Sequence, residues 1–255
     1  MSTLLDRLTV HGKCVLMNYD DGLAEGPMGF NEESVHPSFA LKVAAEGGCQ
    51  GIVLHKGFAE RFYHNLAEGL QAPLIVRLNG RTVLRKDHDL HVTQIASVEE
   101  AVHLGAEAVA TSIYFGSKYE PLMIKDFGAA IGEARRFDVP VFAWVYAKGR
   151  DVPNEFSPEA VSYAARAAAE MGADVVFAPW PGSAKALQIV VHAAAGVPVV
   201  LAGTEKVHER HLFKLAKDAL NAGAIGLTVG KNCLHSQNPV RFLHDLIKIV
   251  CRPES

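Results

Sequence analysis

The chain has few of the residues that mark secretion or nucleic-acid binding. Only four of its 255 residues are cysteines, and no two of them form a CxxC pair, so we expect neither a zinc site nor a disulfide framework. Basic residues are not in excess, since 25 Lys and Arg stand against 28 Asp and Glu. The chain therefore has no basic surface stripe that would predict a nucleic-acid partner.

Long apolar runs are missing as well. The first residues, MSTLLDRLTVHGK, contain no apolar core of a signal peptide, and no uncharged apolar stretch of about 18 residues follows. We therefore expect no membrane partner and a cytoplasmic location. The chain is instead 49% hydrophobic and 21% charged, which is enough to bury one large core. Its length fits one (β/α)8 barrel domain spanning residues 1–255.

Short apolar runs alternate with helical segments from end to end, which predicts eight parallel strands buried on both faces. The predicted strands are Cys14–Asn18, Gly51–Leu54, Pro73–Leu78, Ala108–Ile113, Val139–Val145, Asp174–Ala178, Val197–Leu201 and Ile225–Val229. The predicted helices are Pro37–Glu46, Ala59–Gly69, Ser97–Leu104, Leu122–Arg136, Pro158–Met171, Ala184–Ala194, Val207–Ala222 and Pro239–Cys251. An open, doubly wound sheet is the alternative, but no glycine-rich dinucleotide turn follows the first strand, and a closed α/β TIM barrel is favoured.

Ligands of such barrels bind at the carboxyl ends of the strands, and the last two strands end in glycine-rich turns. The seventh is followed by Gly203, Thr204 and Lys206, and the eighth by Gly230 and Lys231. Backbone amides and ammonium groups in this arrangement predict a phosphate site. The alternative is a pair of ordinary turns with solvated lysines.

Side chains with possible chemistry follow three other strands. Asp20, after the first strand, is a candidate general acid or base, and Tyr146, at the end of the fifth, is a candidate proton donor beside a pocket wall at Trp144. Lys56 follows the second strand and could be a nucleophile toward a carbonyl or an ion-pair partner. Each feature also has a plain structural reading, as a solvated turn or as core.

One segment is dense in metal-type ligands. Lys86–His91 contains two histidines spaced His-x-x-His, but it is predicted to be a loop, where no helix holds the two rings on one face. A solvated loop is the favoured interpretation, and we expect no metal and no cofactor.

Seven segments together resemble the archaeal-type class I fructose-bisphosphate aldolases, whose relatives include the thiolase of autoinducer-2 breakdown and aminodideoxyheptulosonate synthase. They are DDGLAEGP at 20–27, KGFAE at 56–60, LNG at 78–80, ASVEEA at 96–101, WVY at 144–146, AAR at 164–166 and VGKN at 229–232. Each is weak alone, but their order over nearly the whole chain is specific.

The resemblance implies roles for residues already selected. It implies an aspartate at Asp20, a proton-transferring tyrosine at Tyr146, a tryptophan at Trp144, and phosphate held around Gly203, Lys206, Gly230 and Lys231, although Lys231 stands where arginine is usual. It also implies a homo-oligomer built from rings, often with ten subunits.

The resemblance fails at the residue that defines the family's chemistry. That residue is a lysine at the end of strand six, which forms a Schiff base with the ketose carbonyl, and its position falls on Pro179. Proline has no amine that could form an iminium. The first acidic loop also departs, with Asp21, Ala24 and Glu25 where the family tends to have glutamine, glutamate and histidine.

Three functions follow from this comparison. The first is an aldolase-like carbon–carbon lyase for a phosphorylated ketose or keto compound, using Asp20, Tyr146 and an amine relocated to Lys148 or, second, to Lys56. The second is enolisation or isomerisation by acid–base chemistry without a covalent step, with the carbonyl polarised by lysine or by a metal at His88 and His91. The third is a phosphosugar-binding or regulatory relative without catalysis.

Overall fold

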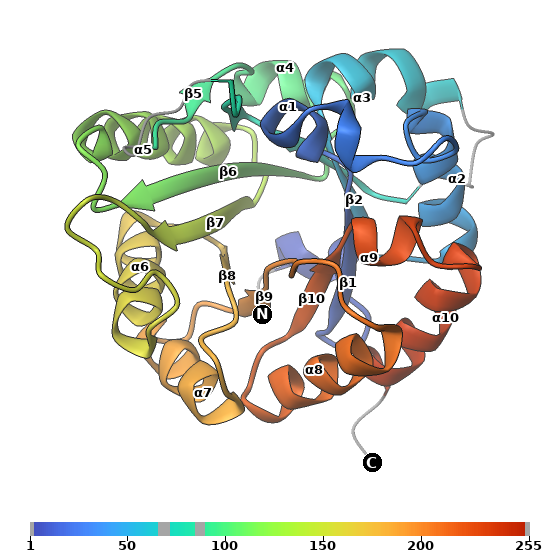
Figure 1. Cartoon of the computed structure of the whole chain (residues 1–255). Coiled ribbons are helices and arrows are strands. Elements are labelled where there is room, and N and C mark those ends of the chain that lie inside the picture. Colours follow the sequence, from blue (N-terminus) through green and yellow to red (C-terminus); the bar gives the residue numbers. More distant parts are fainter. Residues whose placement is uncertain (1–2, 66–71, 85–89, 253–255) are drawn as a thin grey trace.

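The computed structural model describes residues 3–65, 72–84 and 90–252, and within them eight parallel strands close into a barrel (Figure 1). The predicted TIM barrel is therefore confirmed. Each strand pairs with two neighbours, in the order β1-β10-β9-β8-β7-β6-β3-β2. The barrel strands are β1 Cys14–Asn18, β2 Gly51–His55, β3 Leu74–Arg77, β6 Ala108–Phe115, β7 Val141–Ala147, β8 Val175–Ala178, β9 Val199–Leu201 and β10 Gly226–Val229.

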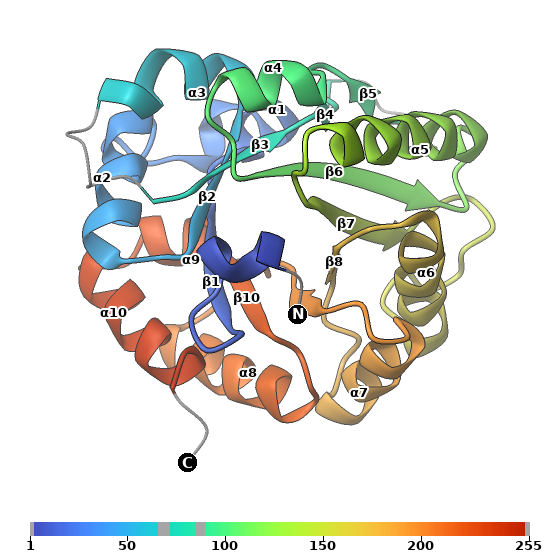
Figure 2. The ribbon, with the colours of Figure 1, turned by 180° about the vertical axis from the view of Figure 1, so that it is seen from behind.

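The strands are continuous in aliphatic residues because both of their faces are buried. Alternate side chains point into the barrel, where Leu16, Ile75 and Phe177 belong to one interior cluster, or outward against the helices. The amino-terminal end of the barrel is covered by the 3-10 helix η1, Thr3–Leu8, whose Leu8 joins the interior cluster (Figure 2). The opposite end, where the strands finish, is left open for a site.

Helices surround the sheet in one layer, as Figures 1 and 2 show from opposite ends. The larger ones are α2 Pro37–Gly47, α3 Lys56–Phe62, α4 Val98–His103, α5 Glu120–Arg136, α6 Pro158–Met171, α7 Ala184–Ala193, α8 Glu209–Asn221 and α10 Pro239–Val250. Ser97 and Glu100 form the expected capping box of α4, and Ser157 caps α6. None of the described helices has the length and apolar character needed to cross a bilayer.

Several elements differ from the predicted ones. The second predicted helix begins earlier, at Lys56, and residues 66–69 of its expected span lie outside the described residues. Strand β6 runs two residues further than predicted, to Phe115, because it pairs with β7 along its whole length. The acidic segment after β1 is not an open loop but forms the short helix α1, Asp21–Glu25, followed by η2, Pro27–Gly29. Two further short strands, β4 Asn79–Gly80 and β5 Thr93–Gln94, pair above the barrel.

The close approach of β10 to β1 requires glycine at position 226 and generates the first prediction. A Cβ added at Gly226 would lie 1.8 Å from the carbonyl oxygen of its register partner Cys14. We expect Gly226→Ala to lower the free energy of unfolding by about 2–3 kcal/mol, because the two strands must separate. Gly128→Ala is the matched control, since Gly128 is exposed within α5 with open space around it.

The control should raise the free energy of unfolding by about 0.5–1 kcal/mol, because alanine favours the helix. Urea unfolding followed by circular dichroism measures both variants. Equal stability of Gly226→Ala and the unsubstituted chain would contradict the described pairing of β1 with β10.

Candidate functional site

The open end of the barrel contains a cavity of about 640 Å³. Seven of the eight strands, or the turns after them, contribute to its wall, and among the described residues β8 contributes none. The polar and aromatic lining residues are Asn18, Asp20, Asp21, Glu25, His55, Arg77, Arg81, Ser112, Tyr114, Trp144, Tyr146, Thr204, Glu205, Lys206 and Lys231, together with Gly80, Gly203 and Gly230. This is the mouth cavity.

The structure brings together most of the residues selected from the sequence. Those that line the mouth cavity are Asp20, Trp144, Tyr146, Gly203, Thr204, Lys206, Gly230 and Lys231. The predicted amines Lys56 and Lys148 are not among the described residues that line it. Lys56 Nζ lies 2.8 Å from Glu100, and Lys148 Nζ lies 2.7 Å from Glu155, so each ammonium group has a carboxylate partner.

A buried ion pair crosses the floor of the cavity. Arg77 Nε donates a hydrogen bond of 2.7 Å to Asp20 Oδ2, and the two side chains are only 5% and 9% exposed. The guanidinium of Arg77 also lies 4.0 Å from the ring centroid of Trp144, which in turn stacks on Phe177 at 3.8 Å. Stacking and the ion pair hold the guanidinium plane in place.

Asp20 uses only one of its carboxylate oxygens in this pair. Its Oδ1 is buried and has no hydrogen-bond partner among the described residues, and the same is true of Asn18 Oδ1 and His55 Nδ1 at the same end of the barrel. Buried polar atoms without partners are uncommon, and each is an available contact for a ligand. Burial lowers the pKa of His55, which favours the neutral ring that can accept as well as donate a hydrogen bond.

Asp21 is the carboxyl group best suited to exchange protons near neutrality. Burial, followed by the charges of Asp20 and Glu25, raises its pKa to about 7, against the opposing influence of Lys231 and Arg77. A group with a pKa near the working pH is an efficient general acid or base. Asp20, and not Asp21, was selected from the sequence as the candidate acid or base of this segment. The only sequence signal for Asp21 is its position directly after Asp20.

Two tyrosines stand together across the cavity from these acids. Tyr114 and Tyr146 stack with centroids 5.1 Å apart and ring planes 18° apart, because β6 and β7 place them in register. Burial, with Tyr114 as the next contribution, raises the pKa of Tyr146 well above its ordinary value. Its hydroxyl is therefore a proton-bearing donor at neutral pH. Tyr114 was missed because the predicted strand ended one residue earlier.

The two glycine turns are held together by Asn232, which follows Lys231. Asn232 Oδ1 accepts a 2.8 Å bond from the amide of Val207, and its Nδ2 donates to the carbonyls of Thr204 and Glu205 at 3.2 and 3.1 Å. The loop after β9 is thus tied to the turn after β10. Lys206 and Lys231 line the mouth cavity from these two turns, and the ammonium group of Lys231 is paired with the carboxylate of Glu25.

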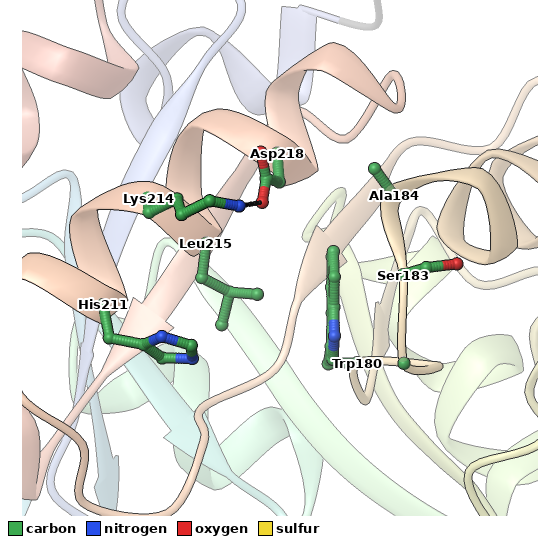
Figure 3. A pocket seen from close by; sticks show the side chains of 8 residues that line it. Trp180, Ser183, Ala184, His211, Lys214, Leu215 and Asp218 are labelled. Carbon is green, nitrogen blue, oxygen red and sulfur yellow. Dashed lines mark hydrogen bonds and ion pairs between the residues drawn. The ribbon is translucent and has the colours of Figure 1, made fainter.

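The chain turns outward after β8. Pro179 is buried, and Trp180 lines a separate cavity of about 370 Å³ between α7 and α8. Figure 3 shows the indole ring standing opposite Leu215, with Lys214 and Asp218 bonded to each other nearby. The segment that follows β8 therefore faces this outer cavity, whose lining includes none of the acids, tyrosines or lysines of the mouth cavity.

The described part of the chain contains no group of three or more histidine, cysteine, aspartate or glutamate side chains arranged to hold a metal ion. His88, from the metal-type segment of the sequence, lies outside the described residues. His91 is described, and its ring packs 5.0 Å from that of Tyr119.

Comparison with known proteins agrees with this architecture. The model of the DeoC/LacD family of aldolases matches residues 14–236. The class 1 fructose-bisphosphate aldolase of Thermoproteus tenax is 37% identical over 242 residues, which are 94% of this chain and 90% of that protein. The enzyme of the same name from Halobacterium salinarum is 34% identical over 244 residues, again 94% of this chain and 90% of that protein.

Solved structures are similar over almost the whole length. An archaeal fructose-1,6-bisphosphate aldolase, with its catalytic Lys covalently bound to the carbinolamine intermediate of the substrate, superposes with a TM-score of 0.92. It shares 35% identity, and 98% of each chain is covered. A second archaeal fructose 1,6-bisphosphate aldolase has a TM-score of 0.90 at 36% identity, with 97% of each chain covered.

The raised pKa of Asp21 predicts a pH dependence of stability. The folded chain binds this proton more tightly than the unfolded chain, so the contribution to the free energy of unfolding decreases as the pH rises from 3.8 to about 7. Asp21→Asn removes the titrating group and keeps a similar shape. We expect the stability of this variant, relative to the unsubstituted chain, to increase with pH across that window.

Urea unfolding at a series of pH values measures the difference. Asp151→Asn, at an exposed turn, is the control and should leave the pH profile unchanged. A stability difference for Asp21→Asn that does not vary with pH would show that the carboxyl has an ordinary pKa.

Proposed function

The chain belongs to the DeoC/LacD family of aldolases, and we propose that it acts at the mouth cavity on a phosphorylated ketose or keto compound, by proton transfer and without the usual Schiff base at the end of β8. The observation that carries the proposal is one cavity that contains two lysines from glycine turns, two adjacent aspartates and a partly buried tyrosine. The reaction class is aldolase-like carbon–carbon cleavage or the related enolisation.

The anionic end of the substrate belongs at the turns after β9 and β10. Gly203 and Gly230 allow close approach to the backbone there, and Lys206 and Lys231 supply positive charge. A Cβ at Gly230 would lie 3.0 Å from the carbonyl oxygen of Asn18, which explains glycine at this turn. A phosphate bound to Lys231 would replace the carboxylate of Glu25, its present partner.

The carbonyl end belongs between the acids and the tyrosines. The unpartnered Oδ1 of Asp20 is available as a base, and Asp21, with a pKa of about 7, can return or remove a proton at neutral pH. The hydroxyl of Tyr146 remains protonated and can donate a hydrogen bond to the oxyanion that develops on the carbonyl oxygen.

The absence of an amine at the end of β8 supports the non-covalent form of the reaction. The residues there are Phe177, Ala178, Pro179 and Trp180, and Trp180 lines the outer cavity instead. Lys148 and Lys56, proposed as relocated amines, stand in ion pairs away from the lining of the mouth.

The same lack of an amine favours a second candidate, which is a phosphosugar-binding protein that carries out no reaction.

Borohydride trapping tests the covalent step. The protein is mixed with dihydroxyacetone phosphate or fructose 1,6-bisphosphate, reduced, and measured by intact-mass spectrometry. We expect no added mass, because the two lysines among the described residues that line the mouth cavity, Lys206 and Lys231, are assigned to the phosphate. An adduct mapped to Lys148 or Lys56 would replace the non-covalent mechanism with a relocated Schiff base.

Proton exchange distinguishes an enzyme from a binding protein. We expect the protein to exchange the carbon-bound protons of dihydroxyacetone phosphate for deuterium in D2O, followed by proton NMR. Tyr146→Phe should slow this exchange by about 100-fold, because the donor to the oxyanion is lost. Tyr163→Phe is the matched control, since Tyr163 is 66% exposed on α6 and should leave the rate unchanged.

Phosphate-dependent binding of the same ketose, without any deuterium exchange, would support the second candidate. Equal rates for Tyr146→Phe and the control would remove Tyr146 from the proposed chemistry.

A further inference from the structure

The helices α1 and α3 lie next to each other (Figure 1). Residues of both helices line a third cavity, of about 530 Å³. It is here called the side pocket. In contrast to the polar mouth, its wall is mostly apolar. It includes Tyr19, Leu23, Phe30, Val35, Phe58 and Ile95, and Lys56 lines it as well. The ring of Tyr19 lies 5.3 Å from that of Phe30 and 6.1 Å from that of Phe58.

The side pocket and the mouth cavity share a boundary. Asp20 and His55 line both of them. Gly80 lines the mouth, and a Cβ added to it would lie 2.4 Å from Leu23 and 3.3 Å from His55, which line the side pocket. The two cavities are thus adjacent, with Asp20 and His55 in the wall between them.

Both shared residues have unused hydrogen-bonding capacity. Asp20 Oδ1 and His55 Nδ1 are both buried and have no partner in the described part of the chain. Polar atoms in this state, at the junction of a charged and an apolar cavity, fit a ligand whose reacting polar group lies between an anionic end and an apolar end.

The wall of the side pocket is a poor match for a polyhydroxylated arm. Hydroxyl groups packed against the apolar side chains, away from Asp20, His55 and Lys56, would lose their hydrogen bonds to water without replacement, which is unfavourable. An aromatic or branched aliphatic group of similar size would instead bury apolar surface against the rings.

We propose that the side pocket binds the apolar or aromatic arm of the substrate, so that the substrate is a phosphorylated ketone whose β-hydroxy carbon carries an apolar group. This inference rests on the proposed function and specifies its substrate class. In cleavage, the bond between the α and β carbons breaks, and Asp20 takes the proton of the β-hydroxyl. The β carbon leaves as an apolar aldehyde. The electron pair forms an enolate on the phosphorylated fragment, whose α carbon then takes up a proton, so no oxidant or reductant is needed.

Binding of benzyl alcohol, an unreactive aromatic probe, tests the pocket by saturation-transfer NMR on the full chain. Val35→Asp places a carboxylate in the wall at a side chain that is 49% exposed, so the fold should tolerate it. We expect the affinity for benzyl alcohol to fall about tenfold, because burying the probe beside a charge is unfavourable. Phe58→Ala, at a ring that is 40% exposed, removes wall area and should act in the same direction.

Ile189→Asp is the matched control, since Ile189 is 50% exposed on α7 and lines neither cavity. It should leave the affinity unchanged. Absence of saturation transfer in the unsubstituted chain, or equal affinity in all four proteins, would overturn the side pocket as a site.

Turnover tests the assignment of the arm. Aldol addition to dihydroxyacetone phosphate should proceed with a higher kcat/KM for benzaldehyde than for glyceraldehyde, and Val35→Asp should reverse the preference. A preference for glyceraldehyde in the unsubstituted chain would overturn the substrate class. No addition of either aldehyde, together with no deuterium exchange, would contradict the proposed function, while the benzyl alcohol measurement still decides the pocket.

Discussion

The ion pair between Asp20 and Arg77 is the interaction on which the mouth of the barrel depends. It joins the end of β1 to β3 across the interior, at side chains that are almost fully buried. Breaking such a pair leaves an uncompensated buried charge, which costs about 3–5 kcal/mol. Because Arg77 also stacks on Trp144 and bonds to Ser112, the pair fixes the floor on which β6 and β7 present their tyrosines. It also leaves Oδ1 of Asp20 without a hydrogen-bond partner in the part of the chain that the structure describes.

The architecture could be predicted from the sequence because it follows from repeated local signals. Continuous aliphatic runs, helices with Ser caps and glycines after their last turns give each β/α unit separately, and parallel pairing then permits few arrangements. The glycine turns with Lys206 and Lys231 were found in the same way, since their place at strand ends defines which face they occupy.

The rest of the site depends on contacts between distant segments. No local pattern shows that Arg77 reaches Asp20, or that Lys56 meets Glu100 rather than the cavity. Lys148 meets a nearer residue, Glu155, seven positions further along the chain. Tyr114 lies beside Tyr146 only because β6 continues past its most apolar stretch to complete its pairing with β7. The side pocket is likewise invisible in the sequence, because its wall comes from three separate segments that are joined above the barrel.

The pairing of Glu25 with Lys231 gives the cavity a built-in counter-ion. Any anion that binds this ammonium group competes with a carboxylate that is tethered beside it, and a tethered competitor acts at a high effective concentration. A singly charged anion such as chloride or a free carboxylate has the same charge as the Glu25 carboxylate that it displaces, so the exchange gains little binding free energy. A doubly charged group is attracted to the ammonium group more strongly than the carboxylate that it displaces. Competition with Glu25 therefore selects doubly charged anions by their charge, independently of their shape.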